Sequence, residues 1–191
     1  MIMKVLNLYF FKISKIKMVD TLKISNALLM KNTLLLLLLA FVFLGSVFES
    51  KAGGSTWTGA GADNNWSTAA NWGGTATATG NDMKFSGNVR PTPNNNLTNF
   101  ACKTIQFLNT ATTSFTLTGN SATTGNITNA SSFLQTINMP LGITAPTTIA
   151  ATSGNITIGS VISGGFGITI TGVASTKVTF SGANSYTGST T

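Results

Sequence analysis

The chain has 191 residues, with 11 Lys and Arg against 4 Asp and Glu, no His, and a formal net charge of +7. Seven of the basic residues lie before residue 53, and beyond it Lys84, Arg90, Lys103 and Lys177 stand against Asp63 and Asp82. Four scattered cations make no stripe that could follow a phosphate backbone, so the charge excludes a nucleic-acid interface.

The amino-terminal part of the chain is predicted to be an export leader. Residues 30–52 contain Lys31, then an apolar run from Leu34 to Phe48, then Ser50-Lys51-Ala52 with small residues at the positions that a signal peptidase reads. The run is shorter than the roughly 20 residues that span a bilayer as a helix. We expect cleavage before Gly53 and no stable membrane span afterwards, with an uncleaved anchor as the alternative.

Residues 1–29 precede this leader and have no counterpart in an ordinary signal peptide. They are interpreted either as an amino-terminal extension or as the product of a start codon called too early. The second interpretation is preferred, with Met30 as the true first residue. The chain is thus expected to be exported, to the cell surface, the outer membrane or the extracellular medium.

Three tryptophans lie close together at the start of the mature segment, at Trp57, Trp66 and Trp72, among Gly, Ser, Thr and Asn. Exposed indoles would stack on sugar rings and form a glycan contact. Buried indoles would instead cover the open end of a stacked fold, whose first layer otherwise exposes apolar side chains and unpaired backbone. Capping is favoured, and residues 53–100 are assigned as a Trp-rich cap segment.

From Gly53 onward short runs of alternating apolar residues replace any helical spacing. Turn signals separate them, such as Gly119-Asn120, Gly154-Asn155 and Gly164-Gly165. Short strands at regular spacing with Gly or Asn between them predict an all-β protein. The apolar pairs are Ile105/Phe107, Phe115/Leu117, Leu141/Ile143, Ile156/Ile158, Ile168/Ile170 and Val178/Phe180.

Two all-β topologies fit this pattern, a β-sandwich and a right-handed parallel β-helix (solenoid). The β-helix is favoured for residues 101–191, because stacked strands tolerate ladders of Thr and Asn and need only one or two aliphatic side chains per strand inside. Ile156, Ile158, Ile168, Ile170, Val178 and Phe180 are then expected to share one core, with Thr157 and Thr169 on the opposite face.

The last 30 residues, 162–191, resemble the autotransporter-associated β-strand repeat, whose hallmark is an apolar strand followed by Gly-Ala-Asn-Thr-Tyr-Thr-Gly-Gly-Thr-Thr. This chain has that motif from Gly182 to Thr191, departing only at Ser185 and Ser189. The motif positions are Gly182, Asn184, Tyr186, Gly188 and Thr190. The Trp segment likewise resembles the stretch that precedes such repeats. The resemblance implies a pectin-lyase-like β-helix passenger of a bacterial exported protein, here incomplete after about one repeat.

Catalysis and metal binding find little support in the side chains of the mature segment. Without His, neither Cys102 nor any Ser has the base that a nucleophile needs, and Cys102, the single cysteine, is read as a small buried apolar residue. Asp63 and Asp82 are the only carboxylates after Gly53. The Asp63-Asn64-Asn65 stretch offers oxygen donors for calcium, but it is more typical of a turn that bonds its own backbone. We expect no enzyme activity, no metal and no cofactor.

The function expected from these observations is that of an exported, non-enzymatic scaffold or adhesin segment. Its partner would be a surface receptor or a glycan, and self-association through the carboxy-terminal strand edge is expected as well. The alternative is a carbohydrate-binding module using Trp57, Trp66 and Trp72. A polysaccharide-degrading β-helix is a distant third, since it rests on fold analogy alone.

Overall fold

The computed structural model describes residues 12, 15, 17, 20, 23 and 55–191. The chain divides into two units, Met1–Lys51 and Ala52–Thr191. The described residues of the first unit are helical. None of the helices in the described part of the chain combines the length and the apolar character needed to cross a membrane. The predicted extension (1–29), the leader (30–52) and its cleavage site before Gly53 otherwise lie outside the described residues.

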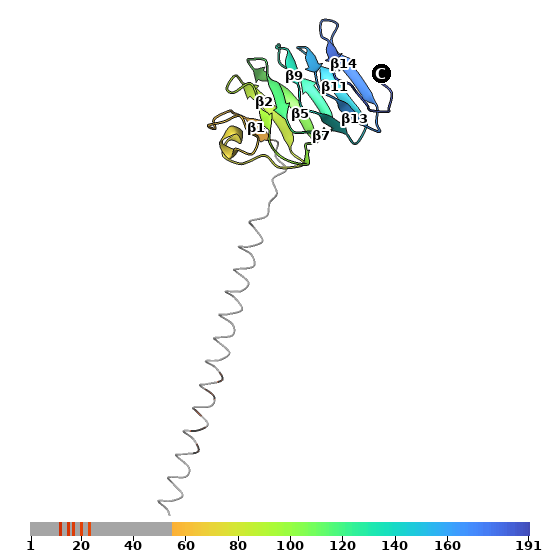
Figure 1. The fold of residues 1–191 in the computed structure, drawn as a ribbon. Helices are drawn as coiled ribbons and strands as arrows, with labels where there is room; N and C mark the ends of the chain where they lie inside the picture. The colour runs from red at the N-terminus through yellow and green to blue at the C-terminus, as the bar shows by residue number, and fades with distance from the viewer. Residues whose placement is uncertain (1–11, 13–14, 16, 18–19, 21–22, 24–54) are drawn as a thin grey trace, which may run out of the picture. The chain divides into compact units, whose positions relative to one another are not determined.

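The second unit is built from three parallel sheets. Sheet 1 runs in the order β1-β2-β5-β8-β11-β14, sheet 2 in the order β3-β6-β9-β12-β15, and sheet 3 in the order β4-β7-β10-β13 (Figure 1). The strands of sheet 1 are β1 Ser55–Trp57, β2 Asp82–Gly87, β5 Thr104–Ala111, β8 Asn126–Asn129, β11 Thr147–Ala151 and β14 Ile168–Gly172. Those of sheet 2 are β3 Asn94–Asn95, β6 Thr116–Gly119, β9 Gln135–Ile137, β12 Ile156–Ile158 and β15 Val178–Phe180. Those of sheet 3 are β4 Phe100–Ala101, β7 Ala122–Thr124, β10 Leu141–Ile143 and β13 Ile162–Gly164.

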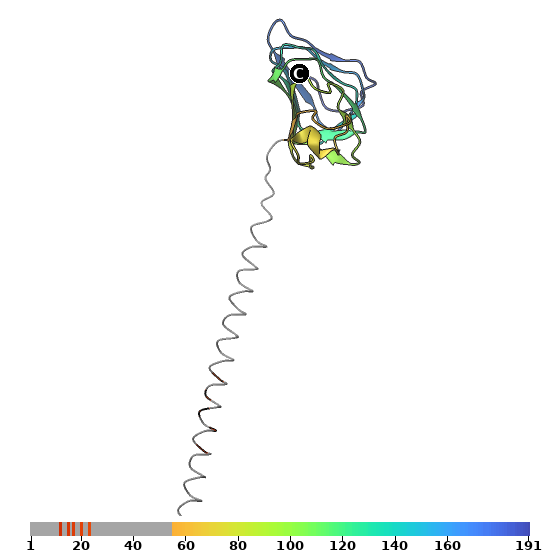
Figure 2. The same ribbon diagram turned by 90° about the vertical axis from the view of Figure 1, so that its left-hand side faces the viewer.

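Each turn of the chain contributes one strand to each sheet and then stacks on the turn before it. Ile105 of β5 pairs with Ile127 of β8, and Ile127 in turn with Ile149 of β11. Viewed from the amino-terminal side, the turns superimpose on one closed outline (Figure 2). The second unit is therefore a parallel β-solenoid, as the strand pattern predicted. The sandwich alternative is wrong, because every strand pair in the described part of the chain is parallel.

The solenoid begins earlier in the chain than the predicted boundary at residue 101. Strands β2, β3 and β4 already belong to the three sheets, although they lie within residues 53–100 or just beyond them. Ahead of them, β1 and the short 3-10 helix η1 (Ala69–Trp72) form the segment that covers the first turn. The cap is therefore shorter than the sequence indicated.

Alternation along the strands decides which side chains fill the interior. Ile156, Ile158 and Ile168 are buried, as predicted. Val178 and Phe180 are only half-buried, and Ile170 is 37% exposed. Val178 and Phe180 still pack against the core, as predicted, and their partial exposure fits the position of β15 as the last strand of sheet 2. The prediction fails at Ile170, which is not part of the buried core.

Several polar side chains are buried at the corners where one strand turns into the next. The Asn129 amide nitrogen donates to the backbone oxygens of Phe133 and Asn155, both at 2.9 Å, and its oxygen accepts from the Ser131 amide. The Gln135 side chain similarly accepts from the Phe115 amide at 2.7 Å. These side chains bond backbone groups that the corners leave without a strand partner, so their burial costs little.

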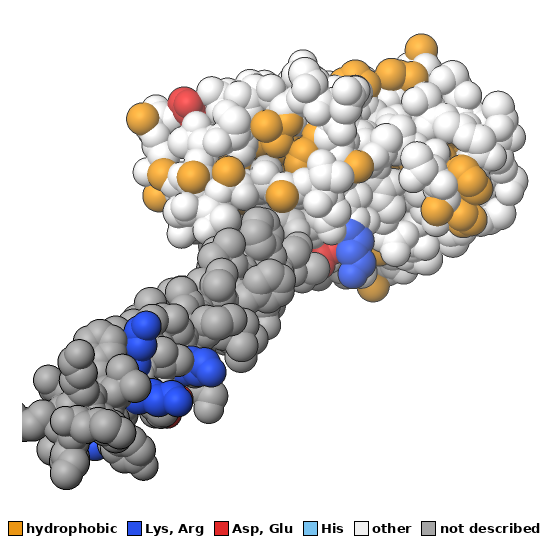
Figure 3. All heavy atoms as spheres, turned by 90° about the horizontal axis from the view of Figure 1, so that it is seen from below, with side chains coloured by type: hydrophobic (Ala, Val, Ile, Leu, Met, Phe, Trp, Pro, Cys, Tyr) orange, Lys and Arg blue, Asp and Glu red, His pale blue; other side chains and the backbone are white. Residues whose placement is uncertain are grey.

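The outer surface of the solenoid is mostly polar and uncharged. On sheet 2, Thr116, Thr136, Thr157 and Thr179 stand in register on four successive strands. The face drawn in Figure 3 carries few charged side chains on the described residues of the second unit. The stack thus presents columns of hydroxyl and methyl groups rather than alternating charges.

Candidate functional site

The three tryptophans predicted to cap the stack or contact glycans form one aromatic cluster inside the protein. Trp57 and Trp66 are 0% exposed and Trp72 is 6% exposed. Trp72 meets both of the others edge to face, with ring centroids 5.0 Å from Trp57 and 6.0 Å from Trp66. Phe85 and Phe100 continue the cluster into the first turn. Such edge contacts are the favoured geometry of aromatic pairs.

The indole nitrogens are not equally satisfied. Trp57 Nε1 lies 3.2 Å from the backbone oxygens of both Val89 and Arg90, and Trp72 Nε1 donates to the Trp66 oxygen at 2.8 Å. Trp66 Nε1 is buried and has no hydrogen-bond partner among the residues that the structure describes. A buried N–H without an acceptor is a local cost that the packing of the ring must offset.

The position of the cluster favours capping over sugar binding. The rings pack on Phe85 of β2, which is the first strand of the first complete turn, and none of them offers a free face to solvent. Stacking on a pyranose needs such a face. In this structure the cluster therefore closes the apolar interior at the amino-terminal end of the solenoid.

The Asp63-Asn64-Asn65 stretch forms the predicted turn. The Asp63 carboxylate accepts from the Asn65 amide at 3.0 Å and from the side chains of Asn65 and Thr68, both at 3.0 Å. The backbone bond from Asn65 and the bond from Thr68 hold the pKa of Asp63 below its ordinary value. Both carboxylate oxygens thus serve the loop itself, as expected for an Asx turn.

The repeat-like motif at the carboxy-terminal end consists of residues that fit the last turn onto the one before it. A side chain at Gly182 would overlap the backbone of Ser160, and one at Gly188 would overlap the backbone at Gly167. The Asn184 side-chain oxygen accepts from the Ile162 amide at 2.9 Å. These three motif positions are therefore architectural, because only small or backbone-bonding residues fit there.

The two remaining motif residues contact each other. The Tyr186 hydroxyl lies 2.6 Å from the Thr190 hydroxyl, and the Tyr186 ring packs partly buried against the core. Thr190 forms a parallel bridge with Ile168 of β14. The motif begins another layer over sheets 3 and 1, and in the described residues it brings no titratable cluster together.

Cys102 lies between β4 and β5 and is 5% exposed, which confirms that it is a buried thiol. Burial is the main cause that raises the pKa of Cys102 to about 11, and Asp82 adds a smaller effect in the same direction. Its Sγ lies 3.5 Å from the Thr123 oxygen. A protonated, enclosed thiol of this kind is a poor nucleophile.

Sequence reasoning missed a groove on the outer face of sheet 3. Its volume is about 340 Å³, and its lining alternates small polar and apolar groups. The lining residues are Asn99, Phe100, Ser121, Ala122, Thr123, Pro140, Leu141, Gly142 and Ser163. These residues come from four turns, so only the stacking register brings them together. Gly142, between two apolar residues of one strand, is the single sequence signal that could have suggested a hollow here.

Elsewhere in the described residues no group of three or more His, Cys, Asp or Glu side chains is placed to hold a metal ion. Comparison with protein-family models, with curated proteins and with solved structures gives no match. The resemblance to the autotransporter-associated repeat therefore depends on the motif residues themselves.

Proposed function

We propose that this protein is an exported, non-enzymatic β-solenoid that serves as a scaffold or adhesin at the cell surface or outside the cell. The observation that carries the proposal is the regular parallel register of the successive turns from β7 to β15. Strand β11 pairs in parallel with β8 on one side and β14 on the other, and the same holds for β12 and β10 in the other two sheets. A regular stack is stiff and extends its outer faces over several turns.

The character of the outer faces supports the same proposal. Hydroxyl and amide side chains in register give a hydrated surface that needs no charge to remain in water. Interaction through such faces would depend on shape and hydrogen bonding rather than on ionic steering. The carbohydrate-binding alternative that used Trp57, Trp66 and Trp72 loses its support, because all three rings are buried.

Export is the part of the proposal that depends on the leader, residues 30–52. The test is a fusion of this segment to alkaline phosphatase, an enzyme that becomes active only after export from the bacterial cytoplasm. We expect high phosphatase activity from the fusion, and loss of it when Leu36 and Leu38 are both changed to Arg, because charge breaks the apolar run. Equal activity from both fusions, or none from either, would refute export by this segment.

A further inference from the structure

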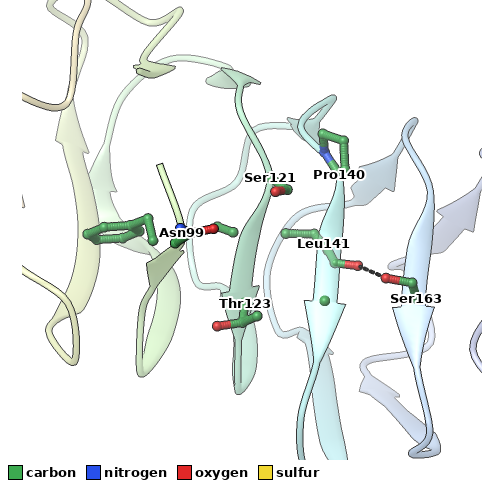
Figure 4. A pocket seen from close by; sticks show the side chains of 9 residues that line it. Asn99, Ser121, Thr123, Pro140, Leu141 and Ser163 are labelled. Carbon is green, nitrogen blue, oxygen red and sulfur yellow. Dashed lines mark hydrogen bonds between the residues drawn. The ribbon is translucent and has the colours of Figure 1, made fainter. Parts of the chain in front are cut away.

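We propose that the groove on the outer face of sheet 3, named here the sheet-3 groove, binds an uncharged, extended glycan. The inference deepens the adhesin function proposed above and depends on it for its biological meaning. The groove crosses the strands β4, β7, β10 and β13, so a ligand lying in it would run along the axis of the solenoid (Figure 4).

The hollow comes from a missing side chain in an outward-facing column. Gly142 of β10 pairs with Thr123 of β7 on one side and with Ser163 of β13 on the other. Thr123 and Ser163 carry side chains at this position (Figure 4), whereas Gly142, paired between them, has none. A Cβ atom at Gly142 would lie 3.1 Å from the Thr123 methyl group, so even alanine would narrow the groove.

The polar groups of the groove are not used by the protein. The side chains of Asn99, Ser121 and Thr123 form no hydrogen bond within the described residues, and Ser163 makes one at 3.4 Å to the Leu141 oxygen. On sheet 1, by contrast, the equivalent outward side chains bond each other, as Thr104 bonds Asp82 at 2.8 Å. The groove therefore offers free hydroxyl and amide donors and acceptors to a ligand.

The lining also limits the chemistry of that ligand. It contains no charged side chain, so it gives no counter-charge for an acidic sugar, a phosphate or an ammonium group. Pro140, which is half-buried, and the methyl group of Thr123 supply carbon surface beside the hydroxyls, whereas the lining residues Leu141 and Phe100 are buried in the interior. A neutral pyranose has this same combination, with equatorial hydroxyls at its edge and C–H groups on its faces.

A peptide fits the groove less well than a glycan does. Strands β7 and β10 each have parallel partners on both sides, so neither has a free edge to which a peptide could add as another strand. The ligand has to bind through side chains alone. Stacked strands lie about 4.8 Å apart, so the four strands span about 14 Å. The distance between neighbouring strands is close to the length of one sugar unit in an extended β-linked glycan. Successive sugars would therefore lie over successive strands.

The test is calorimetric titration of the purified chain with neutral hexasaccharides, namely cellohexaose, xylohexaose, chitohexaose and mannohexaose. We expect saturable binding of at least one of them. Gly142→Thr fills the gap with a residue type that the neighbouring strand already carries, and it should weaken binding at least about tenfold. Thr123→Val keeps the shape, removes one hydroxyl, and should weaken binding roughly fivefold.

Matched controls come from sheet 2, outside the groove. Gly159→Thr places the same side chain at the exposed residue that follows β12, where the nearest group is the movable end of the Asn138 side chain. Thr157→Val removes an outward hydroxyl of β12. Both should bind as the parent chain does.

Three results would overturn the proposal. They are the absence of binding to any neutral hexasaccharide, binding by Gly142→Thr equal to that of the parent chain, and preference for a polygalacturonate hexamer or an extended uncharged peptide. If Gly142→Thr does not fold, the test is the comparison of glycan affinity between Thr123→Val and Thr157→Val. Equal affinity of these two variants would overturn the proposal. None of these outcomes depends on export, so the two proposals can fail separately.

Discussion

Ile149 of β11 and Ile170 of β14 are paired in register and occupy the same inward position, yet Ile149 is 1% exposed and Ile170 is 37% exposed. The side chains are identical, and so are their places in the strand. Only their neighbours differ, because β11 has a full strand on both sides, whereas β14 is followed on its outer side only by residues 189–191, whose backbone bonds Ile168 and Ile170. In this solenoid burial is set by the adjacent turns more than by the residue type.

A first prediction uses that difference. Ile158→Asp should abolish folding, since an unpaired carboxylate in the closed interior costs several kcal/mol or more. Ile170→Asp should cost about 1–2 kcal/mol, because the carboxylate can remain in contact with water at this position. Thr157→Asp, on the outer face, should be within about 0.5 kcal/mol of the parent chain. Urea unfolding gives the three values. Equal effects of Ile158→Asp and Thr157→Asp would show that the strand register is wrong.

The sequence was sufficient to predict the alternating core and the all-β class, because alternation in Ile156-Thr157-Ile158 depends only on local backbone geometry. It was insufficient for the corners, where Asn129 and Gln135 are buried although their polarity suggests exposure. Their burial depends on backbone groups from other turns. The sheet-3 groove was missed for the same reason, since its lining becomes adjacent only when Thr123 and Gly142 fall into register.

A second prediction concerns the outer edge of β15, the last strand of sheet 2. We expect the 191-residue chain to self-associate through this edge, because β15 has no partner on one side among the described residues, and its flanking Val178 and Phe180 are half-buried apolar residues. Thr179→Lys should reduce the association, since a charge on an edge strand opposes pairing.

The matched control for Thr179→Lys is Thr136→Lys, in the same outward column but on β9, which has partners on both sides. It should leave the association unchanged. Sedimentation velocity over a range of concentrations measures both variants. A parent chain that remains monomeric at high concentration would contradict the expectation, as would an equal effect of the two lysines.

A third prediction separates two buried indoles. Trp72→Phe removes the donor to the Trp66 oxygen and leaves that oxygen without its bond, whereas Trp66→Phe removes an N–H that has no partner in the described residues. Both changes lose ring volume, so both destabilise. Trp72→Phe should cost about 1 kcal/mol more in unfolding free energy than Trp66→Phe. A larger loss for Trp66→Phe in denaturant titrations would show that its N–H is bonded in solution.

A fourth prediction follows from the raised pKa of Cys102. In the unfolded chain the thiol ionises near 9.0, but in the folded chain burial keeps it protonated until about pH 11. The thiol's contribution to the free energy of unfolding should therefore be fully present below pH 9.0 and should be lost as the pH rises toward about 11. The variant Cys102→Ala isolates this part, because the other groups titrate equally in both proteins.

The unfolding free energy of the parent chain minus that of Cys102→Ala should be constant below pH 9.0 and should fall as the pH rises toward about 11. Consistent with this, Ellman's reagent at pH 8 should react with Cys102 only after denaturation. A thiol that reacts rapidly in the folded protein, or a difference that does not change with pH, would contradict the burial of Cys102.

The most direct test of the central claim, an exported solenoid released from its leader, is the intact mass of the protein recovered from the cell surface or the medium of a bacterial host. The account predicts a chain that begins at Gly53, because Ser50 and Ala52 fit the signal peptidase. The recovered chain should also show the circular dichroism of β-structure. A protein that remains in the cytoplasm, or one recovered with residues 30–45 still attached, would contradict the account.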